Sequence, residues 1–244
     1  MKVRLTVVGS SPAWPNPGGA QSGYLVEGNG RLLLDCGPGV LARLREREAW
    51  PDVEAIAITH FHLDHWGDLV PWVWGSMFGL GHGRDRPALW VHRGGRERLR
   101  DFGARLGRDT MFEDCFVVEE YADDEPFAAA GLEVTPLRLP HYTLETYGFR
   151  VSNGDHTIAY SGDTGPSERL AELARAADLF VCEATLERPE LDGEPRGHLS
   201  ADEATAAFEA SGARRLLITH RPSELPLDGK LEQAHDGLIV DLTH

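Results

Sequence analysis

The segment with the densest set of reactive side chains is Thr59-His60-Phe61-His62-Leu63-Asp64-His65. Imidazole nitrogens and carboxylate oxygens are the usual protein ligands of zinc and similar divalent metals. In an extended turn, His60 and His62 can point the same way, while Asp64 and His65 turn toward a second position as the chain enters a helix. The segment therefore predicts ligands for two adjacent metal ions. The alternative is a loop of surface histidines, which rarely forms such a cluster directly after a core strand.

Three more candidate ligands share the local context of His60, just past the end of an apolar, strand-like run. His141 follows residues 132–139, Asp163 follows 158–162 and His220 follows 216–219. Each of these residues alone would be explained equally well as a loop histidine or a helix-capping aspartate. Four strand ends that carry the same kind of group favour one shared metal site.

In this order along the chain, the motifs resemble the signature of the metallo-β-lactamase superfamily: His-x-His-x-Asp-His, His141, Ser-Gly-Asp-Thr around Asp163, and Leu-Ile-Thr-His ending at His220. The resemblance covers nearly the whole chain. It implies an α/β fold, a four-layer αββα sandwich with the metal site at one edge of two packed sheets. It also implies a ligand set for two metals: His60, His62 and His141 for the first, Asp64, His65 and His220 for the second, and Asp163 as the bridge.

The two divalent metals define the chemistry that this resemblance implies. Zinc is the first candidate, and manganese or iron(II) are alternatives, because a site without thiolate ligands accepts all three. Two metals roughly 3.5–4 Å apart lower the pKa of bound water toward ~7 and stabilise both ends of an in-line displacement. The superfamily hosts many hydrolases, so these motifs specify the substrate less well than the fold.

A second pair of motifs narrows the reaction. Cys182-Glu183-Ala184-Thr185 and Gly197-His198-Leu199-Ser200 resemble a Glu and His pair of the ribonuclease Z branch and its phosphodiesterase relatives. The resemblance implies that His198 assists the leaving group, that Glu183 orients it, and that Asp64 is both a ligand and a proton acceptor. A departing alkoxide needs a proton, and histidine suits that task near neutral pH. Alternatively, His198 is a loop residue before a helix cap and Glu183 a buried carboxylate at a strand end.

The chain spacing and the net charge bear on the size of the substrate. Ribonuclease Z carries a long tRNA-gripping arm between the positions that match His141 and Asp163. Here Asp163 follows His141 by only 22 residues, and a hairpin takes up that length. The chain has 24 Lys and Arg against 39 Asp and Glu, a net charge of −15, and such a surface repels polyanions. A large nucleic-acid footprint is therefore disfavoured.

The leading hypothesis is hydrolysis of a small phosphodiester, with a cyclic nucleotide as the first candidate. The motifs resemble those of small bacterial phosphodiesterases such as the atypical class II-like cyclic-AMP phosphodiesterases. The first alternative is an RNA 3′-end endonuclease like ribonuclease Z. A lactonase or thioesterase would share the dimetal site without needing Glu183 and His198. A metal-holding scaffold without activity is the non-enzymatic alternative.

Apolar periodicity and turn residues predict the elements that position these side chains. Strands are expected at residues 3–8, 24–27, 31–35, 53–59, 88–92, 116–119, 132–139, 147–152, 156–161, 178–182 and, as the last clear one, 215–219. Helices are expected over 40–48, over 166–177, and from a capping box at Ser200 to Gly212. This interleaving favours an α/β architecture, and 244 residues fit one large domain, 1–244.

Composition predicts the compartment. Cys36, Cys115 and Cys182 form no Cys-x-x-Cys pair, which is typical of reduced, buried thiols in a cytoplasmic protein. No uninterrupted apolar run is long enough for a transmembrane helix, so a cytoplasmic location without a membrane partner is expected.

Several residues carry weaker signals. Asp35 could orient a ligand histidine or only shape a turn. The loop with Ser10, Ser11 and Gly18-Gly19 could face the substrate. One aromatic cluster could stack a nucleobase, although core packing or a homodimer interface is favoured: Trp72, Trp74, Met77 and Phe78. The remaining histidines are expected to be surface or packing residues: His82, His92, His156, His235 and His244.

Overall fold

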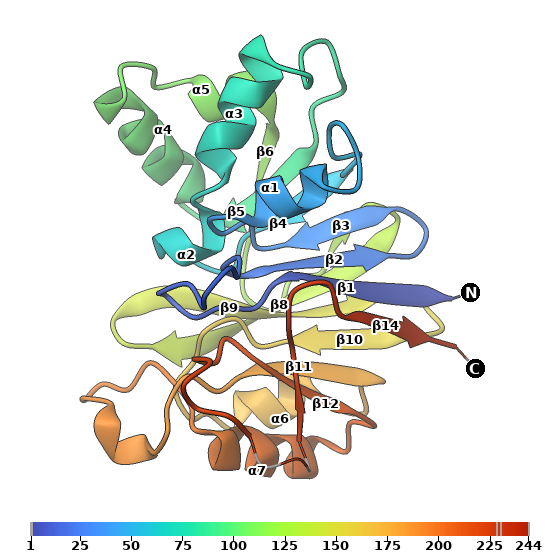
Figure 1. The fold of residues 1–244 in the computed structure, drawn as a ribbon, viewed down its shortest axis with the longest axis vertical. Helices are drawn as coiled ribbons and strands as arrows, with labels where there is room; N and C mark the ends of the chain where they lie inside the picture. Colours follow the sequence, from blue (N-terminus) through green and yellow to red (C-terminus); the bar gives the residue numbers. More distant parts are fainter. Residues whose placement is uncertain (1, 228, 230, 244) are drawn as a thin grey trace.

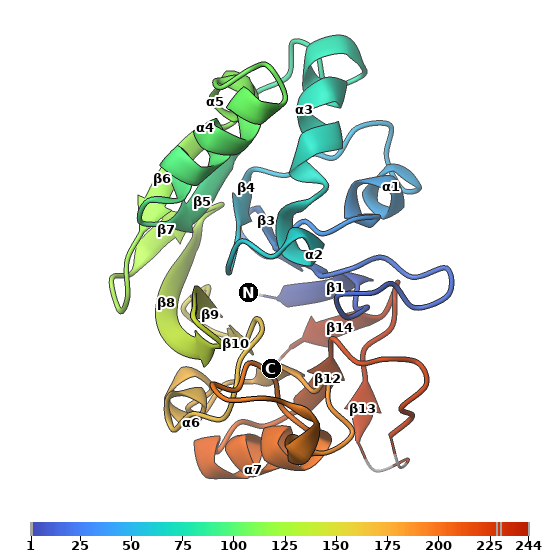
Figure 2. The ribbon, with the colours of Figure 1, turned by 90° about the vertical axis from the view of Figure 1, so that its left-hand side faces the viewer.

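Two seven-stranded sheets pack face to face, and helices cover both outer faces (Figure 1). The computed structural model describes residues 2–227, 229 and 231–243, so His244 lies outside the described residues. The predicted four-layer αββα sandwich is confirmed. Helices α1 to α5 lie on one side of the sheet pair, and α6 and α7 lie on the other (Figures 1 and 2).

The first sheet has the order β14-β1-β2-β3-β4-β5-β6. Its strands are β1 (Val3–Gly9), β2 (Gly23–Glu27), β3 (Arg31–Leu34), β4 (Ala55–Ala57), β5 (Ala88–His92), β6 (Val117–Tyr121) and β14 (Ile239–Leu242). The second sheet has the order β13-β12-β11-β10-β9-β8-β7. Its strands are β7 (Phe127–Ala129), β8 (Leu132–His141), β9 (Leu144–Ser152), β10 (Thr157–Tyr160), β11 (Leu179–Glu183), β12 (Leu216–Thr219) and β13 (Glu232–Gln233).

The helices are short, and most follow a parallel strand. The first sheet is covered by α1 (Val40–Arg45), α2 (Leu63–Trp66), α3 (Leu69–Phe78), α4 (Gly95–Arg105) and α5 (Met111–Cys115). The second is covered by α6 (Arg169–Leu173) and α7 (Ala201–Ser211), with a 3₁₀ turn η1 (Pro189–Leu191) between β11 and α7. Ser200 and Glu203 form the predicted capping box of α7, and Gly212 ends that helix in the left-handed conformation.

Three hydrophobic clusters hold the layers together. One lies between the two sheets and includes Leu5 and Phe149, and the other two lie beneath the helices of each outer face. Every residue of β4, β11 and β12 is buried, because these strands have a helix layer on one face and the partner sheet on the other. This double burial explains their uninterrupted apolar sequences. Cys36, Cys115 and Cys182 are free and buried, as predicted.

Several element boundaries differ from those predicted. Helix α1 ends at Arg45 rather than at 48, and α6 covers only Arg169–Leu173 of the predicted 166–177. Ala176 has a φ of 50°, which is incompatible with a continuing right-handed helix. Two strands follow the last clear strand predicted at 215–219, namely β13 and β14, and β14 pairs with β1. Those strands are short and half-exposed, so their apolar pattern is weak.

The candidate ligands gather where the parallel strands end. Strands β3 and β4 run parallel in one sheet, and β10, β11 and β12 run parallel in the other. The carboxyl ends of such strands are where ligands bind in open α/β sheets. A Cβ atom on Gly37 would lie 1.9 Å from the Asp64 carbonyl oxygen, so only glycine lets the loop after β3 approach α2 this closely. Among the described residues, no helix is long and apolar enough to cross a membrane.

Candidate metal centre

One group of side chains converges on His62. Its Nδ1 atom lies 3.1 Å from His60 Nε2 and 3.0 Å from His141 Nε2. The Asp163 Oδ2 atom lies 4.0 Å from His60 Nε2, and all four side chains could hold one ion together. Two nitrogens bound to the same tetrahedral zinc ion are about 3.3 Å apart, given Zn–N bonds of about 2.0–2.1 Å. The spacing of these nitrogens therefore fits a shared cation.

A second group lies directly beside the first. The Asp64 Oδ2 atom is 3.3 Å from His65 Nε2 and 3.2 Å from His220 Nε2. The Asp163 Oδ1 atom is 3.2 Å from His65 Nε2 and 3.5 Å from His220 Nε2. Asp163 thus turns one carboxylate oxygen toward each group. All seven residues proposed from the sequence as ligands come together, in the two sets that the resemblance implied.

Hydrogen bonds outside the centre fix which ring nitrogen faces inward. The Gly197 carbonyl can only accept, so the His141 Nδ1–H donates to it at 2.6 Å, and Nε2 keeps its lone pair. The Nδ1 of His65 lies 2.7 Å from Asp35 Oδ2, and that of His220 lies 2.9 Å from Thr185 Oγ1. Three inward Nε2 lone pairs result, which is the arrangement that a metal ligand needs.

Asp35 is one of the residues for which the sequence left two roles open. Its carboxylate is fully buried and accepts hydrogen bonds from the Thr59 backbone N–H, the Thr59 hydroxyl and the Tyr160 hydroxyl, besides that from His65. Asp35 has a φ of 59°, a left-handed conformation that aspartate tolerates better than most residues. Asp35 therefore orients a candidate ligand, as one of the two alternatives predicted.

Burial and nearby charges shift the pKa values in the centre in both directions. Burial lowers the pKa of His65, but the carboxylates of Asp163, Asp64 and Asp35 outweigh it and hold that pKa well above its usual range. Burial is the main cause that lowers the pKa of His60, His62 and His141 below its usual range. Burial on its own raises the pKa of Asp163, but His220 and His65 outweigh it and hold that pKa well below the usual value. His65 Nε2 and Asp163 Oδ1 are buried without a hydrogen-bond partner. Unpartnered buried polar atoms are costly, and divalent cations would satisfy them.

The candidate catalytic pair lies beside the second group. His198 Nδ1 is 2.9 Å from Glu183 Oε1, and the His198 ring stacks on that of His220 at 5.9 Å. Burial lowers the pKa of His198, but the carboxylates of Glu183 and then Asp163 outweigh that effect and raise it to about 9. Glu183 is itself fully buried and accepts hydrogen bonds from the backbone of Thr164 and from Thr185. The pair is therefore held in a fixed geometry by hydrogen bonds.

The sequence did not reveal two residues that hold this pair in place. The Thr185 hydroxyl connects Glu183 Oε2 with His220 Nδ1, at 3.0 and 2.9 Å. Asp192 accepts hydrogen bonds from the backbone N–H groups of Gly197 and His198. The position of Thr185 in the Glu-Ala-Thr motif was the one available signal, whereas Asp192 lies in a loop without any pattern.

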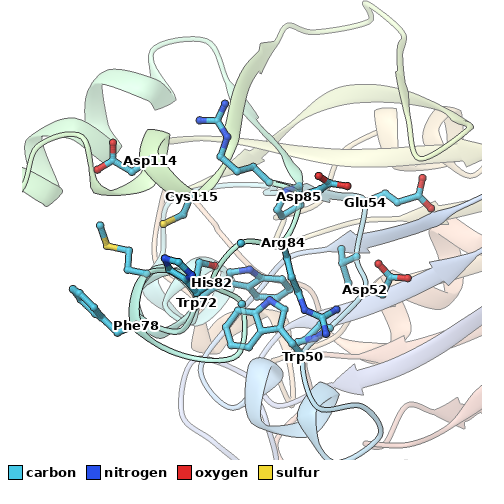
Figure 3. Close-up of a pocket in the computed structure, with 18 of the residues that line it drawn as sticks. Trp50, Asp52, Glu54, Trp72, Phe78, His82, Arg84, Asp85, Asp114 and Cys115 are labelled. Carbon is cyan, nitrogen blue, oxygen red and sulfur yellow. The ribbon is translucent and has the colours of Figure 1, made fainter.

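The cavity beside the centre differs from the one that the aromatic cluster lines. A cavity of about 460 Å³ contains His198 and His220 on its wall. A larger cavity of about 880 Å³ is lined by Trp72, Met77 and Phe78 (Figure 3). Its other lining residues include Asp52 and Glu54, which precede β4, whereas His60 follows that strand. Trp72, Met77 and Phe78 therefore lie toward the end of β4 opposite the metal centre.

The members of that cluster have different environments. Trp72 is buried in the core, as the core-packing alternative predicted. The exposed rings of Trp74 and Phe78 stack on each other. His92 and His156 are buried packing residues, and His82 and His235 are exposed. The loop with Ser10, Ser11, Gly18 and Gly19 lines a separate cavity of about 430 Å³. His198 and His220, which line the 460 Å³ cavity, do not line this one.

Comparisons with known proteins agree with this geometry. Residues 30–221 match the domain family described as "Beta-lactamase superfamily domain". The chain is 35% identical over 232 residues to the uncharacterized protein ML1173 of Mycobacterium leprae, an alignment that covers 90% of this chain and 78% of that protein. It is 26% identical to the ribonuclease Z of Myxococcus xanthus over an alignment of 309 positions, gaps included, which covers 98% of each chain.

A solved structure extends the likeness to three dimensions. The metallo-β-lactamase fold protein YhfI from Bacillus subtilis superposes with a TM-score of 0.85 at 25% identity, covering 99% of this chain and 100% of that one. In sequence the same protein, named a probable metallo-hydrolase, is 29% identical over 223 residues, covering 90% of this chain and 87% of YhfI. The chain therefore belongs to the metallo-β-lactamase superfamily, in the ribonuclease Z-like branch of its metallo-hydrolases.

Proposed function

We propose that the protein is a dinuclear metal-dependent phosphodiesterase that hydrolyses a small nucleotide phosphodiester, with a cyclic nucleotide as the first candidate substrate. The observation that carries this proposal is the pair formed by the buried Glu183 and the partly exposed His198, which lie 2.9 Å apart, with the His198 ring stacked against His220. A thioester releases a thiolate, a weakly basic leaving group that needs little help from an acid. An alkoxide that leaves a phosphodiester needs a proton, which this histidine can supply.

Each residue of the centre has a defined task in this proposal. His60, His62, His141, Asp64, His65, Asp163 and His220 would hold two divalent cations, with zinc as the first candidate. When bound, these cations supply an activated water and positive charge for the phosphoryl oxygens. The chain then contributes proton transfer. Asp64 accepts a proton from the attacking water, and His198, charged through Glu183, donates one to the leaving oxygen.

A small substrate is favoured over a long RNA by the segment between His141 and Asp163. That segment contains only β9, β10 and the turns beside them, so it has no room for an arm that would grip tRNA. The net charge of −15 also repels polyanions. The likeness to ribonuclease Z supports the chemistry of phosphodiester cleavage. The short segment and the negative charge argue against a substrate as large as tRNA.

The test compares His198→Ala with the unchanged protein, both loaded with zinc or manganese. We expect kcat for 3′,5′-cyclic AMP, which releases an alkoxide, to fall by roughly 10²–10⁴-fold, the usual effect of removing a general acid. For bis-p-nitrophenyl phosphate, whose p-nitrophenolate leaves without a proton, kcat should fall much less. Metal content, measured by mass spectrometry, should stay unchanged. The matched control is His82→Ala, which removes an exposed histidine outside the centre and should leave kcat unchanged.

Three results would contradict the proposal. If His198→Ala loses its metals, that histidine is structural rather than catalytic. If lactones or thioesters are hydrolysed faster than phosphodiesters, and His198→Ala does not change that rate, the enzyme is a lactonase or thioesterase. If a 3′-extended tRNA is cleaved in preference to cyclic nucleotides, the ribonuclease Z alternative is correct.

A further inference from the structure

The 460 Å³ cavity beside His198 has two exposed aromatic side chains that the metal chemistry does not use. Tyr142 is 39% exposed and Trp14 is 51% exposed, and both line this cavity together with His198 and His220. Large aromatic rings at such exposure leave apolar area in water unless a ligand covers it. The cavity lies beside His198, the proposed acid for the leaving group. A group bound in this cavity would therefore belong to the substrate.

Tyr142 is held rigidly despite its exposure. It lies in the two-residue turn between β8 and β9, directly after His141, with a φ of 50° that a bulky residue rarely adopts. Its side chain interacts with Asp192, the same carboxylate that accepts a hydrogen bond from the backbone N–H of His198. Its ring also lies so close to Gly197 that a Cβ atom there would meet it at 2.3 Å. A strained, fully supported side chain at this place indicates a functional role.

The loop that carries Trp14 is also anchored at both ends. The Gln21 side chain, itself buried, donates hydrogen bonds to the carbonyls of Pro12 and Ala13. The Asn16 side chain donates to the Arg221 carbonyl and accepts from the Ser223 backbone. The loop is therefore tied to the segment that follows His220, which places Trp14 at the cavity without any packing of its ring into the core.

The charges around the cavity limit what can bind there. Glu187, Asp192 and Glu224 line it, and none of its described lining residues is a lysine or an arginine. A second phosphate group would meet carboxylates rather than cations. A neutral group that donates hydrogen bonds would find three acceptors there. Leu186 and Leu225 complete an apolar lining between the rings and the carboxylates.

From these observations we infer that Trp14 and Tyr142 form a subsite for the nucleobase of a substrate that carries a single phosphodiester charge. A nucleobase is planar and neutral and carries at least one N–H donor, such as the amino group of adenine, so it fits the rings and the carboxylates together. An acyl chain would gain nothing from three carboxylates, and a polyphosphate would be repelled. The inference rests on the proposed phosphodiesterase function and adds the residues that select the base.

The experiment measures KM and kcat for 3′,5′-cyclic AMP and for its abasic analogue, 1-deoxyribose 3′,5′-cyclic phosphate. Stacking one base on an aromatic side chain is worth ~1–3 kcal/mol, so we expect Trp14→Ala to raise KM for cyclic AMP about tenfold or more. Its kcat, and both constants for the abasic analogue, should stay unchanged. Tyr142→Phe keeps the ring and should keep KM within about threefold. Trp74→Ala, which removes an exposed tryptophan elsewhere, is the matched control.

The outcomes separate this inference from the proposed function. Equal effects of Trp14→Ala on both substrates, or no effect on either, would overturn the base subsite while leaving the phosphodiesterase intact. If the unchanged protein hydrolyses neither substrate, the proposed function fails, and binding of adenosine monophosphate measured by calorimetry decides the subsite alone. Weaker binding by Trp14→Ala would then support the subsite, and equal binding would overturn it.

Discussion

The substitution Asp35→Asn tests whether a residue outside the ligand set controls one of the two metal positions. The Asp35 carboxylate accepts hydrogen bonds from His65 Nδ1 at 2.7 Å and from the Tyr160 hydroxyl at 2.8 Å, with Thr59 on its other side. Asparagine tolerates the φ of 59° at this position at least as well as aspartate, so the backbone should not move. The substitution therefore changes charge and hydrogen bonding alone.

The expected effect follows from the hydrogen bonds that the amide can make. When the oxygen of the new amide accepts the hydrogen bond from the Thr59 backbone N–H, the NH₂ group of the amide faces His65 Nδ1. That nitrogen must then accept a hydrogen bond instead of donating one. The proton of the His65 ring moves to Nε2, the atom that faces Asp64 and Asp163. Loss of such an outer hydrogen bond typically weakens metal binding 10–100-fold, or ~1.4–2.7 kcal/mol. The first group, built on His62, should not respond.

The assay is a titration of metal-free protein with zinc in competition with a chromophoric chelator, which resolves two dissociation constants. For Asp35→Asn we expect one constant to rise 10–100-fold and the other to change by less than about threefold. Tyr160→Phe is the control, because it removes one donor from the same carboxylate and leaves His65 unaltered. Equal weakening of both metals, or an equal effect of Tyr160→Phe, would refute this reasoning.

Three further predictions concern stability and charge. Removal of the metals with a chelator should lower Tm in calorimetry by roughly 10 °C, because the buried carboxylates and imidazoles lose their counter-charges; an unchanged Tm would mean that no metal was bound. Gly37→Ala, whose Cβ would clash with the Asp64 carbonyl, should lower the free energy of unfolding, measured in urea, by about 3 kcal/mol. Gly193→Ala, with open space around the new Cβ, should change that free energy by less than about 0.5 kcal/mol. Combining Glu187→Lys with Glu224→Lys should raise kcat/KM for a short RNA about tenfold at low salt, and a gain that persists in high salt would exclude the electrostatic cause.

The ligand set could be predicted from the sequence because each member has a local signal. His60, Asp163 and His220 each follow a largely buried strand, and burial on both faces leaves an apolar run in the sequence. His141 ends β8, in which exposed residues are interspersed among buried ones. The carboxyl ends of such strands share an edge of the sheet, so the order of the motifs also indicates that they meet. The capping box at Ser200 was readable for the same local reason.

Weakly patterned elements were missed for a physical reason. Strand β14 alternates exposed and buried residues over only four positions, and it is stable because it pairs with β1 from the other end of the chain. The aromatic cluster shows the same limit. Trp72 and Trp74 are two positions apart, yet one is in the core and the other is exposed, since only the packing of α3 decides which side faces inward.

The sequence by itself determined which groups could hold metals and which pair could move a proton, because residue type and strand-end position are local properties. The tertiary structure alone decided which oxygen of Asp163 faces which histidines, that Asp35 orients His65, and that Trp14 and Tyr142 share a cavity with His198. These relations join segments far apart in the chain. They depend on how two sheets pack against each other, and no local pattern of side chains encodes that packing.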